Sequence, residues 1–510
     1  MSEIAVELKE ITKKFGDVVA NDSVSLIVNK HEILSVLGEN GSGKTTLMNM
    51  IAGIYRPDSG KILIDGNEVT IHSPKDAYKY KIGMIHQHYK LVNVFTAAEN
   101  IILGQDTGKV LDIKKVKADI QNICDLYGFK INPDQKIYDM SVSEKQTVEI
   151  IKVLYKGADI LILDEPTAVL TPQETKSLFQ VLRNMRENGK SVIIITHKLN
   201  EVMEISDRVT VLRKGKYIDT VKTKNTSIQA LTEMMVGEKI DLDIKRSMPV
   251  NPKQVLKVEN LTCVSKEGIT VLDNVSFTVR SGEFLGIAGI AGCGVRELFE
   301  CIDGIHRYTK GKITFYDKDG NEIDLTNKST KDFKKLGVRI AFVPEDRLGM
   351  GLVGPMGMTD NVMLRSYRKG KVPIVKRKEP RSLAAAIKKR LEVKTPNIEY
   401  PVRRLSGGNV QKVLVGREIS SSPDILMVAY PVRGLDINSS YLIYNKLNEQ
   451  KCQGAAVMSI IEDLDVLLDL SDRILVLNNG HITGIVDART TTKEEIGYLM
   501  TADVSEVKNV

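Results

Sequence analysis

Residues 38–46, with the sequence GENGSGKTT, limit most strongly what this chain can fold into. They follow the apolar run of residues 33–37 and lead into residues 47–52, as a turn between a strand and a helix would. The turn matches the phosphate-loop pattern G-x-x-x-x-G-K-[ST]. Its glycines let several backbone N–H groups turn toward phosphate oxygens, and the helix N-terminus adds positive potential. The pattern therefore predicts a nucleotide-phosphate site, in which Lys44 reaches the β- and γ-phosphates and the Thr45 hydroxyl holds Mg²⁺.

Internal repetition predicts how the chain is divided. NDSVSLIV at residues 21–28 precedes the phosphate loop, and the similar DNVSFTV at residues 273–279 precedes a second glycine-rich turn at residues 289–294. SDRVTVL at residues 206–212 also recurs as SDRILVL at residues 471–477. The chain is therefore a tandem duplication, and each copy alternates strands with helices in an α/β pattern.

We predict two domains, at residues 1–237 and 254–501. Between them, residues 238–253 mix charges with two prolines and lack a sustained apolar period, which is typical of a linker. Residues 502–510 are expected to form a C-terminal tail. A length of 510 residues agrees with more than one hydrophobic core.

Composition narrows the class of protein. No segment approaches the ~20 consecutive apolar residues that span a bilayer, and residues 1–4 do not begin a secretory signal. The five cysteines are scattered at no zinc or disulfide spacing, which suits a reducing cytosol. The net charge of +7 comes from interspersed lysines and glutamates, so it favours neither nucleic acid nor a membrane surface as a partner.

Polar residues follow three further apolar runs of the first half. Asp164 and Glu165 end one run, where Asp164 is placed to hold Mg²⁺ and Glu165 to polarise an attacking water. His197 ends another run and is a candidate contact of a γ-phosphate, while Gln87 is a candidate ligand of Mg²⁺ or water. Taken one by one, an Asp-Glu pair before a proline is also an ordinary loop start, and a lone histidine is usually structural.

Together, the phosphate loop, Gln87, Asp164, Glu165 and His197 resemble the nucleotide-binding domain of ABC transporters. So does LSGGNVQ at residues 405–411, which is similar to the signature motif of that superfamily. The resemblance covers nearly the whole chain. It implies two tandem P-loop ATPase domains, each with a mostly parallel sheet flanked by helices, an antiparallel β subdomain and a helical subdomain. It also implies that ATP and Mg²⁺ are bound, and that two domains clasp ATP so that each phosphate loop faces the other domain's signature.

The two halves depart from this family pattern in opposite ways. At the signature of the first half, Val142 and Ser143 replace glycines, so a Cβ obstructs the approach of backbone amides to the γ-phosphate. Thr171 replaces the aspartate of the D-loop. The second half keeps its signature and D-loop aspartate but replaces the catalytic positions, with Val295, Arg296, Glu345, Ala429, Tyr430 and Glu462. The role of Arg296 has two interpretations, a phosphate contact or a salt bridge on a surface helix.

The resemblance therefore implies one complete site per chain, composed of parts from both halves. The ATP-binding residues expected from the first half are Phe15, which stacks on adenine, and Gly38, Glu39, Asn40, Gly41, Ser42, Gly43, Lys44, Thr45 and Thr46. Those expected from the second half are Ser406, Gly407, Gly408 and Asp436. The metal ligands expected are Thr45, Gln87 and Asp164, and the catalytic residues are Glu165, His197, Lys44 and Gln87. We predict that the other, degenerate site hydrolyses no ATP.

A tandem chain with a degenerate second half resembles the ATPases of bacterial sugar and nucleoside importers. HYKLVNVFTAAEN at residues 88–100 and AYPVRGLD at residues 429–436 are similar to the nucleoside branch, although Val295 and Arg296 depart even from that branch. The resemblance implies a subunit that hydrolyses ATP to power the import of nucleosides or related sugar-containing solutes. The alternative is an importer ATPase for sugars of the ribose or galactose type.

The resemblance also implies the partners. These are two membrane-spanning permease subunits and an extracytoplasmic substrate-binding lipoprotein, with no nucleic acid and no direct contact with the transported substrate. The chain is then expected at the cytoplasmic face of a prokaryotic cell membrane, with permease helices in grooves at residues 87–100 and 345–361. Two other classes compete: a soluble tandem ABC protein acting on ribosomes or DNA, and a module that binds ATP without turnover, which Glu165 and His197 disfavour.

Overall fold

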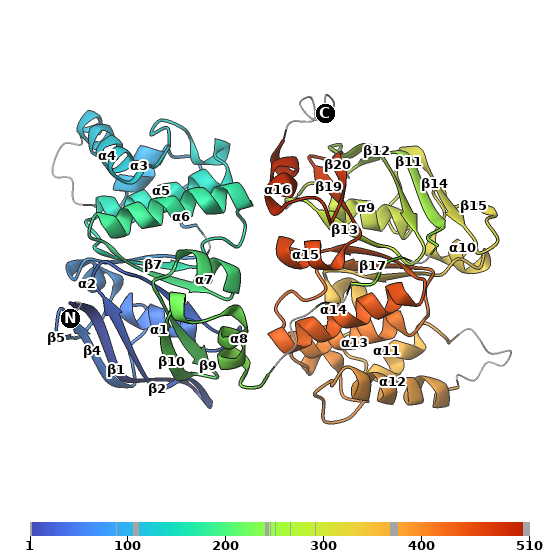
Figure 1. Ribbon diagram of the computed structural model, residues 1–510, viewed down its shortest axis with the longest axis horizontal. Coiled ribbons are helices and arrows are strands. Elements are labelled where there is room, and N and C mark those ends of the chain that lie inside the picture. Colours follow the sequence, from blue (N-terminus) through green and yellow to red (C-terminus); the bar gives the residue numbers. More distant parts are fainter. Residues whose placement is uncertain are drawn as a thin grey trace. The chain divides into compact units, whose positions relative to one another are not determined.

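The computed structural model describes residues 3–87, 89–105, 112–239, 244, 246–249, 251–265, 267–290, 292–367 and 376–502. The chain divides into two compact units, unit 1 (Met1–Asp241) and unit 2 (Leu242–Val510), whose elements are drawn in Figure 1. The division falls inside the predicted linker. Within that segment, Arg246 donates hydrogen bonds to the carbonyl oxygens of Leu468 (2.9 Å) and Ser471 (2.5 Å), so this part of it packs on unit 2. Of the predicted tail, Ala502 alone is among the described residues.

Unit 1 contains two sheets. The first is antiparallel with the order β2-β1-β4-β5, and its strands are β1 (Ile4–Phe15), β2 (Val18–Asn29), β4 (Ser59–Ile64) and β5 (Asn67–Val69). The second has the order β10-β9-β3-β8-β7-β6, and its strands are β3 (Ile33–Leu37), β6 (Ile82–Ile85), β7 (Ile160–Asp164), β8 (Ser191–Thr196), β9 (Arg208–Arg213) and β10 (Lys216–Lys222). Its neighbours pair in parallel except β10 with β9. The central strands are apolar throughout because both of their faces are buried.

The helices of unit 1 lie between and around these strands. They are α1 (Lys44–Ile51), α2 (Pro74–Lys79), α3 (Ala97–Ile102), α4 (Ile113–Tyr127), α5 (Val142–Tyr155), α6 (Pro172–Glu187), α7 (Leu199–Ile205) and α8 (Ile228–Val236), with the 3₁₀ turns η1 (Ile137–Asp139) and η2 (Thr223–Asn225).

Side-chain alternation along the parallel sheet makes unit 1 a three-layer structure. Leu34 and Val36 of β3 point into a core shared with α1 and the antiparallel sheet. Val192 and Ile194 of β8 point into a second core, shared with α3 to α6. The phosphate loop leaves the end of β3 between these two cores, and the parallel register brings the carboxyl ends of β3, β6, β7 and β8 to one edge.

Unit 2 repeats this plan. Its antiparallel sheet has the order β12-β11-β14-β15, with β11 (Gln254–Val264), β12 (Thr270–Arg280), β14 (Lys310–Tyr316) and β15 (Glu322–Asp324). Its mostly parallel sheet has the order β16-β17-β18-β13-β19-β20, with β13 (Phe284–Ala288), β16 (Ile340–Val343), β17 (Ile425–Ala429), β18 (Ala456–Ile460), β19 (Arg473–Asn478) and β20 (His481–Asp487).

The helices of unit 2 also follow the order of unit 1. They are α9 (Val295–Ile302), α10 (Thr330–Lys335), α11 (Met358–Met363), α12 (Lys378–Arg390), α13 (Gly407–Ile419), α14 (Ile437–Cys452), α15 (Leu464–Leu470) and α16 (Lys493–Thr501), with the turns η3 (Arg347–Gly351) and η4 (Val402–Arg404). The predicted α/β fold of two tandem domains, each with a parallel and an antiparallel sheet, is confirmed.

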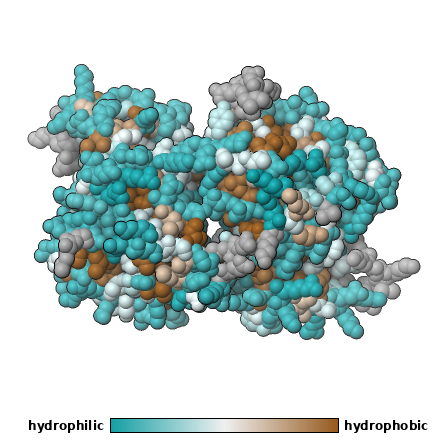
Figure 2. All heavy atoms as spheres, viewed as in Figure 1, coloured by the Kyte–Doolittle hydropathy of each residue, from teal (hydrophilic) through white to brown (hydrophobic). Residues whose placement is uncertain are grey.

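Figure 2 shows a mainly hydrophilic surface on the face drawn, with apolar residues in separate patches. No helix within the described ranges combines the length and the apolar character that crossing a membrane requires.

Candidate active site

The phosphate loop of unit 1 has a backbone that side chains would disrupt at two positions. Gly43 has φ 93° and a Cβ there would lie 2.3 Å from the Ala20 carbonyl oxygen, while a Cβ at Gly38 would lie 2.3 Å from the Leu212 carbonyl oxygen. Both positions therefore require glycine. Asn21 of β2 holds the loop in place, because its Nδ2 donates to the Gly43 carbonyl oxygen at 3.2 Å. Sequence reasoning did not select Asn21, whose role depends on a contact between two segments.

Lys44 begins α1 and folds back over the loop. Its Nζ donates to the carbonyl oxygens of Gly38 (2.7 Å) and Glu39 (3.0 Å). Burial lowers the pKa of Lys44, and the nearby carboxylates of Glu165 and Asp164 oppose that shift. The ammonium is thus held beside the loop by acceptors that phosphate oxygens can replace.

The rest of the loop contains exposed and buried residues. Asn40 and Gly41 are exposed at its tip, and Thr46 lies half-buried in the first turn of α1. Ser42 is buried, and its Oγ has no hydrogen-bond partner among the described residues. An unpartnered buried hydroxyl beside Lys44 leaves a polar contact open to a ligand.

Polar residues from three strand ends meet in front of the loop. Glu165 lies at the centre, since its Oε2 accepts a hydrogen bond from Gln87 Nε2 at 3.2 Å and its Oε1 lies 2.9 Å from His197 Nδ1. Thr45 Oγ1 donates to Asp164 Oδ1 at 3.4 Å. The structure therefore brings together the residues that the sequence predicts from separate segments.

The two adjacent carboxyl groups have pKa values shifted in opposite directions. Burial, and then the charge of Glu165, raise the pKa of Asp164. The hydrogen bond with His197 lowers the pKa of Glu165. Glu165 has φ 48°, in the left-handed region, and its N–H donates to the Ile195 carbonyl oxygen at 2.9 Å. This unusual backbone turns its side chain away from the strand path, toward His197 and Gln87.

Phe15 lies at the end of β1 and is 44% exposed. Its ring packs edge-on against Tyr55 with centroids 5.2 Å apart, and Lys13 Nζ lies 5.5 Å from its centroid. Tyr55 and Lys13 are neighbours that sequence reasoning missed. The exposed ring offers a face on which a planar base can stack.

The signature positions of the two units differ at the helix N-terminus. In unit 1, Ser141 Oγ accepts from the N–H of Glu144 (3.2 Å), and Glu144 Oε2 accepts from the N–H of Ser141 (2.7 Å), a reciprocal capping box on α5. In unit 2, Ser406 makes no side-chain cap on α13, and its hydroxyl accepts from Asn409 Nδ2 at 2.7 Å. The first N–H groups of α13 are therefore not used by the side chain that precedes the helix.

Glycine at position 408 is not required by the packing of unit 2. A Cβ at Gly408 would have Leu435 as its nearest neighbour at 3.7 Å, an ordinary contact. Asp436 caps α14 and accepts hydrogen bonds from the N–H (2.8 Å) and the hydroxyl (2.7 Å) of Ser439. Thr171 caps α6 in the same way with Glu174, so both D-loop positions are helix caps.

The phosphate loop of unit 2 keeps the backbone conformation of the loop in unit 1 but lacks its lysine. Gly294 has φ 98°, and a Cβ there would lie 2.4 Å from the Val271 carbonyl oxygen, as at Gly43. Val295 stands in place of the lysine, is 6% exposed and belongs to the apolar core. Arg296 Nε donates to Glu300 at 2.7 Å one turn along α9, which supports the salt-bridge interpretation of Arg296.

An ion-pair cluster occupies the strand ends of unit 2. Tyr430 repeats the backbone of Glu165, with φ 50° and an N–H donated to the Ile460 carbonyl oxygen at 3.1 Å. Arg433 pairs with Glu345 and with Glu462 (3.6 Å), and its guanidinium lies 5.8 Å from the Tyr430 ring centroid. Burial and these two glutamates raise the pKa of Tyr430 to about 12. The sequence identified the substitutions, but not that Arg433 joins them.

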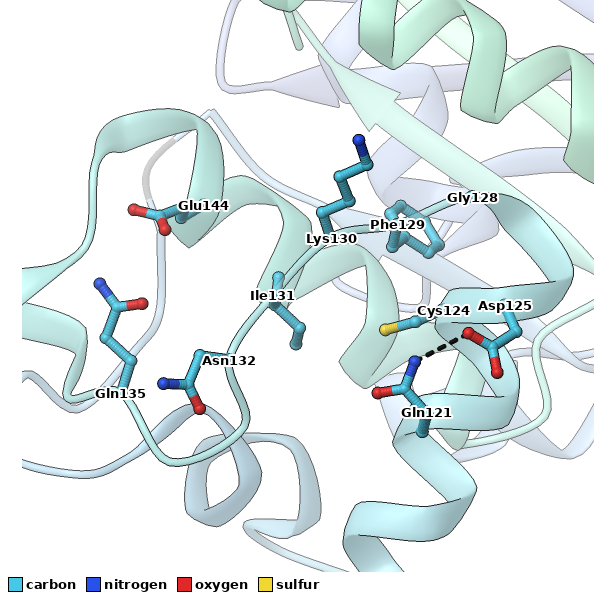
Figure 3. A pocket seen from close by; sticks show the side chains of 10 residues that line it. All are labelled: Gln121, Cys124, Asp125, Gly128, Phe129, Lys130, Ile131, Asn132, Gln135 and Glu144. Atoms are coloured by element: carbon cyan, nitrogen blue, oxygen red, sulfur yellow. Dashed lines mark hydrogen bonds between the residues drawn. The ribbon is translucent and has the colours of Figure 1, made fainter.

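A separate cavity of about 610 Å³ lies in the helical part of unit 1 (Figure 3). Cys124 and Phe129 line it, and Gln121 Nε2 donates to Asp125 Oδ1 at 2.7 Å on its wall. None of the predicted site residues is among its lining residues.

The buried strand, glycine loop and helix of unit 1, with Lys44 and a neighbouring Asp-Glu pair, define a P-loop nucleoside triphosphatase. The model of the ABC transporter family matches residues 21–168 and 272–431, once in each unit. The chain belongs to the ABC transporter family, and it is an ATP-binding ATPase of that family, as the sequence predicts.

Three relatives match nearly the whole chain. The nucleoside import ATP-binding protein NupA of Lactococcus lactis subsp. cremoris is 41% identical, with 98% of each chain covered. The guanosine import ATP-binding protein NupO of Bacillus subtilis is 41% identical, with 98% of this chain and 97% of NupO covered. The ribose import ATP-binding protein RbsA of Clostridium tetani is 38% identical, with 96% of each chain covered.

A solved structure of similar fold covers both units. It is the archaeal ribosome recycling factor aABCE1, in complex with the ribosomal stalk protein aP1. The TM-score is 0.62 at 16% identity, with 94% of this chain and 90% of that chain covered. At this level of identity the likeness concerns the fold alone.

Proposed function

We propose that this chain is the ATP-hydrolysing subunit of a nucleoside importer. The observation that supports it most directly is the 41% identity to two nucleoside import ATP-binding proteins over nearly full length. Import of sugars is the second candidate, favoured by the 38% identity to a ribose import protein. A nucleoside contains a ribose, so the two candidates share part of their substrate chemistry.

We further propose that one ATP is held by parts of both units. Unit 1 supplies the phosphate loop with Lys44, the cluster around Glu165, and Phe15 for the adenine. Unit 2 supplies the turn at residues 406–408 and Asp436. Support comes from complementary features: α13 has an N-terminus without a side-chain cap and a glycine that its own unit does not need, whereas α5 is capped. An N-terminus of this kind suits a γ-phosphate.

The residues present also fit a bound Mg²⁺. The Thr45 hydroxyl, the Gln87 amide oxygen and the Asp164 carboxylate are hard oxygen donors, which Mg²⁺ prefers together with phosphate oxygens. Thr45 and Asp164 already lie within 3.4 Å of each other. When bound, Mg²⁺ supplies positive charge at the β- and γ-phosphate oxygens.

In this mechanism, Glu165 accepts a hydrogen bond from the attacking water, aligns it with the γ-phosphorus and takes up the proton that the water loses. The bond from the water oxygen to phosphorus forms as the bond to the bridging β–γ oxygen breaks, giving ADP and phosphate. His197 keeps Glu165 ionised and in place, through the contact of 2.9 Å. Lys44 and the N–H groups of α13 stabilise charge on the γ-phosphate oxygens.

The partners are part of the proposal: two permease subunits, an extracytoplasmic binding protein and a position at the cytoplasmic membrane face. Both predicted grooves have the same internal support. Asn100 exchanges hydrogen bonds with the backbone of Val92 (2.8 and 3.1 Å), and Asn361 does so with Val353 (2.8 and 3.2 Å). Exposed apolar side chains, including Phe95, lie on these segments. A rigid loop with an apolar surface suits a helix of a permease.

Transport by cells tests this proposal. A strain whose only copy carries Glu165→Gln is expected to lose uptake of labelled nucleosides and to keep uptake of labelled ribose. The chain is expected to co-purify with membrane permeases. Loss of ribose uptake alone favours the sugar importer, and co-purification with ribosomes in place of permeases contradicts both.

A further inference from the structure

Arg347 ties the signature turn of unit 2 to the loop that follows β17. It is the first residue of η3, a single π-helical turn after β16. Its Nη1 donates to the Gly407 carbonyl oxygen at 3.2 Å, and its Nη2 donates to the carbonyl oxygen of Arg433. One guanidinium therefore joins three segments that are far apart in the sequence.

A second arginine ties the other end of η3 to the same helix. Arg417, in the last turn of α13, is buried, and its Nη2 donates to the Gly351 carbonyl oxygen at 2.7 Å. The buried carboxylate of Glu418 accepts from Arg417 Nε at 2.7 Å, and it also accepts two hydrogen bonds from Arg365. Charge-assisted hydrogen bonds therefore join η3 to α13 at both ends of η3.

Unit 1 joins the corresponding segments by another side chain. Gln146 of α5 donates to the Pro166 carbonyl oxygen, after β7, at 2.8 Å. Gln411 has the matching position on α13, but within the described residues neither its Nε2 nor its Oε1 has a partner. Tyr89 follows Gln87 by two residues in unit 1, and Arg347 follows the corresponding Glu345 by two residues in unit 2. Tyr89 therefore occupies the position of Arg347. In unit 2, Arg347 therefore supplies the link that the glutamine makes in unit 1.

Building on the composite site proposed above, we propose that Arg347 is a positioning residue for ATP hydrolysis. The carbonyl of Gly407 and the N–H of Gly408 belong to one planar peptide unit, so a bond that fixes the carbonyl also orients the N–H. The guanidinium polarises that peptide and strengthens its N–H as a donor to the γ-phosphate. Arg347 itself does not touch ATP.

The same contact connects the signature turn to the predicted permease groove. Leu348 and Met350 belong to η3 and are 42% and 39% exposed. Arg347 belongs to the same turn, so its bond to Gly407 lies beside the apolar surface proposed to receive a permease helix.

The test compares Arg347→Met with Arg347→Lys in the full-length chain. We expect Arg347→Met to lower kcat for ATP hydrolysis about tenfold or more, with KM for ATP changed less than about threefold, because Arg347 does not bind ATP directly. Lysine bonds only one carbonyl and should restore part of the rate. Arg339→Met is the matched control, since Asp424 is the one carboxylate that pairs with Arg339 among the described residues, and both lie at the opposite ends of the strands. It should keep the parental rate.

A double-mutant cycle separates positioning from general destabilisation. Ser406→Ala weakens the same turn, so its effect and that of Arg347→Met should be less than additive. Additive effects, or a kcat for Arg347→Met within about twofold of the parent, overturn the positioning role.

Gly408→Val tests the composite site itself. If this variant keeps the parental rate of hydrolysis, the proposal of a composite site is wrong. If Gly408→Val abolishes hydrolysis and Arg347→Met does not lower it, only the present inference fails. Melting temperatures identify variants that do not fold.

Discussion

The position of the Glu165 side chain is fixed by its contacts with Gln87 and His197 and by a left-handed backbone. If it orients and activates water, Glu165→Gln should reduce steady-state hydrolysis at least about 10²–10⁴-fold. Binding of ATP should persist, because Lys44 and the phosphate loop are unchanged. Release of phosphate and retention of labelled ATP after gel filtration measure the two effects. Appreciable residual turnover contradicts the assigned role.

The contact between His197 and Glu165 predicts a pH effect. The hydrogen bond from His197 lowers the pKa of Glu165, so the carboxylate stays ionised at more acidic pH than an isolated glutamate would. His197→Asn removes this bond, and the pKa of Glu165 should rise. The acid limb of the kcat/KM profile should therefore move to higher pH. An unshifted acid limb in this variant, with a reduced rate at every pH, contradicts the coupling.

Residues at strand ends were predictable from the sequence, whereas their connecting partners were not. Asp164, Glu165 and His197 each end an apolar run, and parallel strands bring such ends to one edge. Arg347 and Arg433 act through carbonyl oxygens or carboxylates of distant segments, and no local pattern marks such contacts. Gln87 was a candidate ligand from its position after an apolar run, and the structure adds its bond to Glu165.

At the level of elements, the two signature helices differ in whether a side chain bonds the backbone N–H groups of the first turn. Ser141 caps α5, whereas Ser406 does not cap α13. Ser406→Arg places a long cation at the uncapped N-terminus of α13, where the γ-phosphate is proposed to lie. We expect hydrolysis to fall about 10²–10³-fold, comparable to losing an oxyanion donor. Phosphate release at saturating ATP measures this effect.

Ser141→Arg is the matched control in unit 1. It breaks the capping box of α5 and should cost about 1 kcal/mol of stability, while hydrolysis stays near the parental rate. Equal losses of hydrolysis in Ser406→Arg and Ser141→Arg contradict the division of roles between the two helices.

Element boundaries followed from local signals to different degrees. The helix after each phosphate loop begins directly after the left-handed glycine, Gly43 or Gly294, so α1 starts at Lys44, inside the loop pattern and not after residue 46. The π-helical turn η3 had no such signal, because its shape depends on bonds to α13. The absence of a side-chain cap at Ser406 also could not be predicted, since the same serine type caps α5.

For the whole molecule, the duplication visible in the sequence corresponds to two units with matching strand orders. Each unit's assignment to the α/β class follows from apolar runs separated by helices. How residues 238–253 divide between linker and unit could not be predicted, because the bonds of Arg246 to unit 2 are long-range contacts.

Restoring a single lysine should not restore the second site. Val295→Lys recreates the loop pattern in unit 2, but Ala429 and Tyr430 still stand where the two carboxylates would be. Total hydrolysis should stay at the parental rate, and calorimetry should show a loss of about 3 kcal/mol or more, because an ammonium enters an apolar core. Lys44→Val, the reciprocal change, should abolish hydrolysis. A gain of turnover in Val295→Lys contradicts this prediction.

The burial of Val295 also bears on the history of the chain. Val295 fills the core beneath the phosphate loop of unit 2, so packing alone favours the shape of this loop, whether or not it holds a ligand. A single substitution of Val295 back to lysine is then disfavoured, because it lowers stability before it adds any activity. If ATP is held as proposed, this stability cost favours keeping the two halves of the chain in their separate roles.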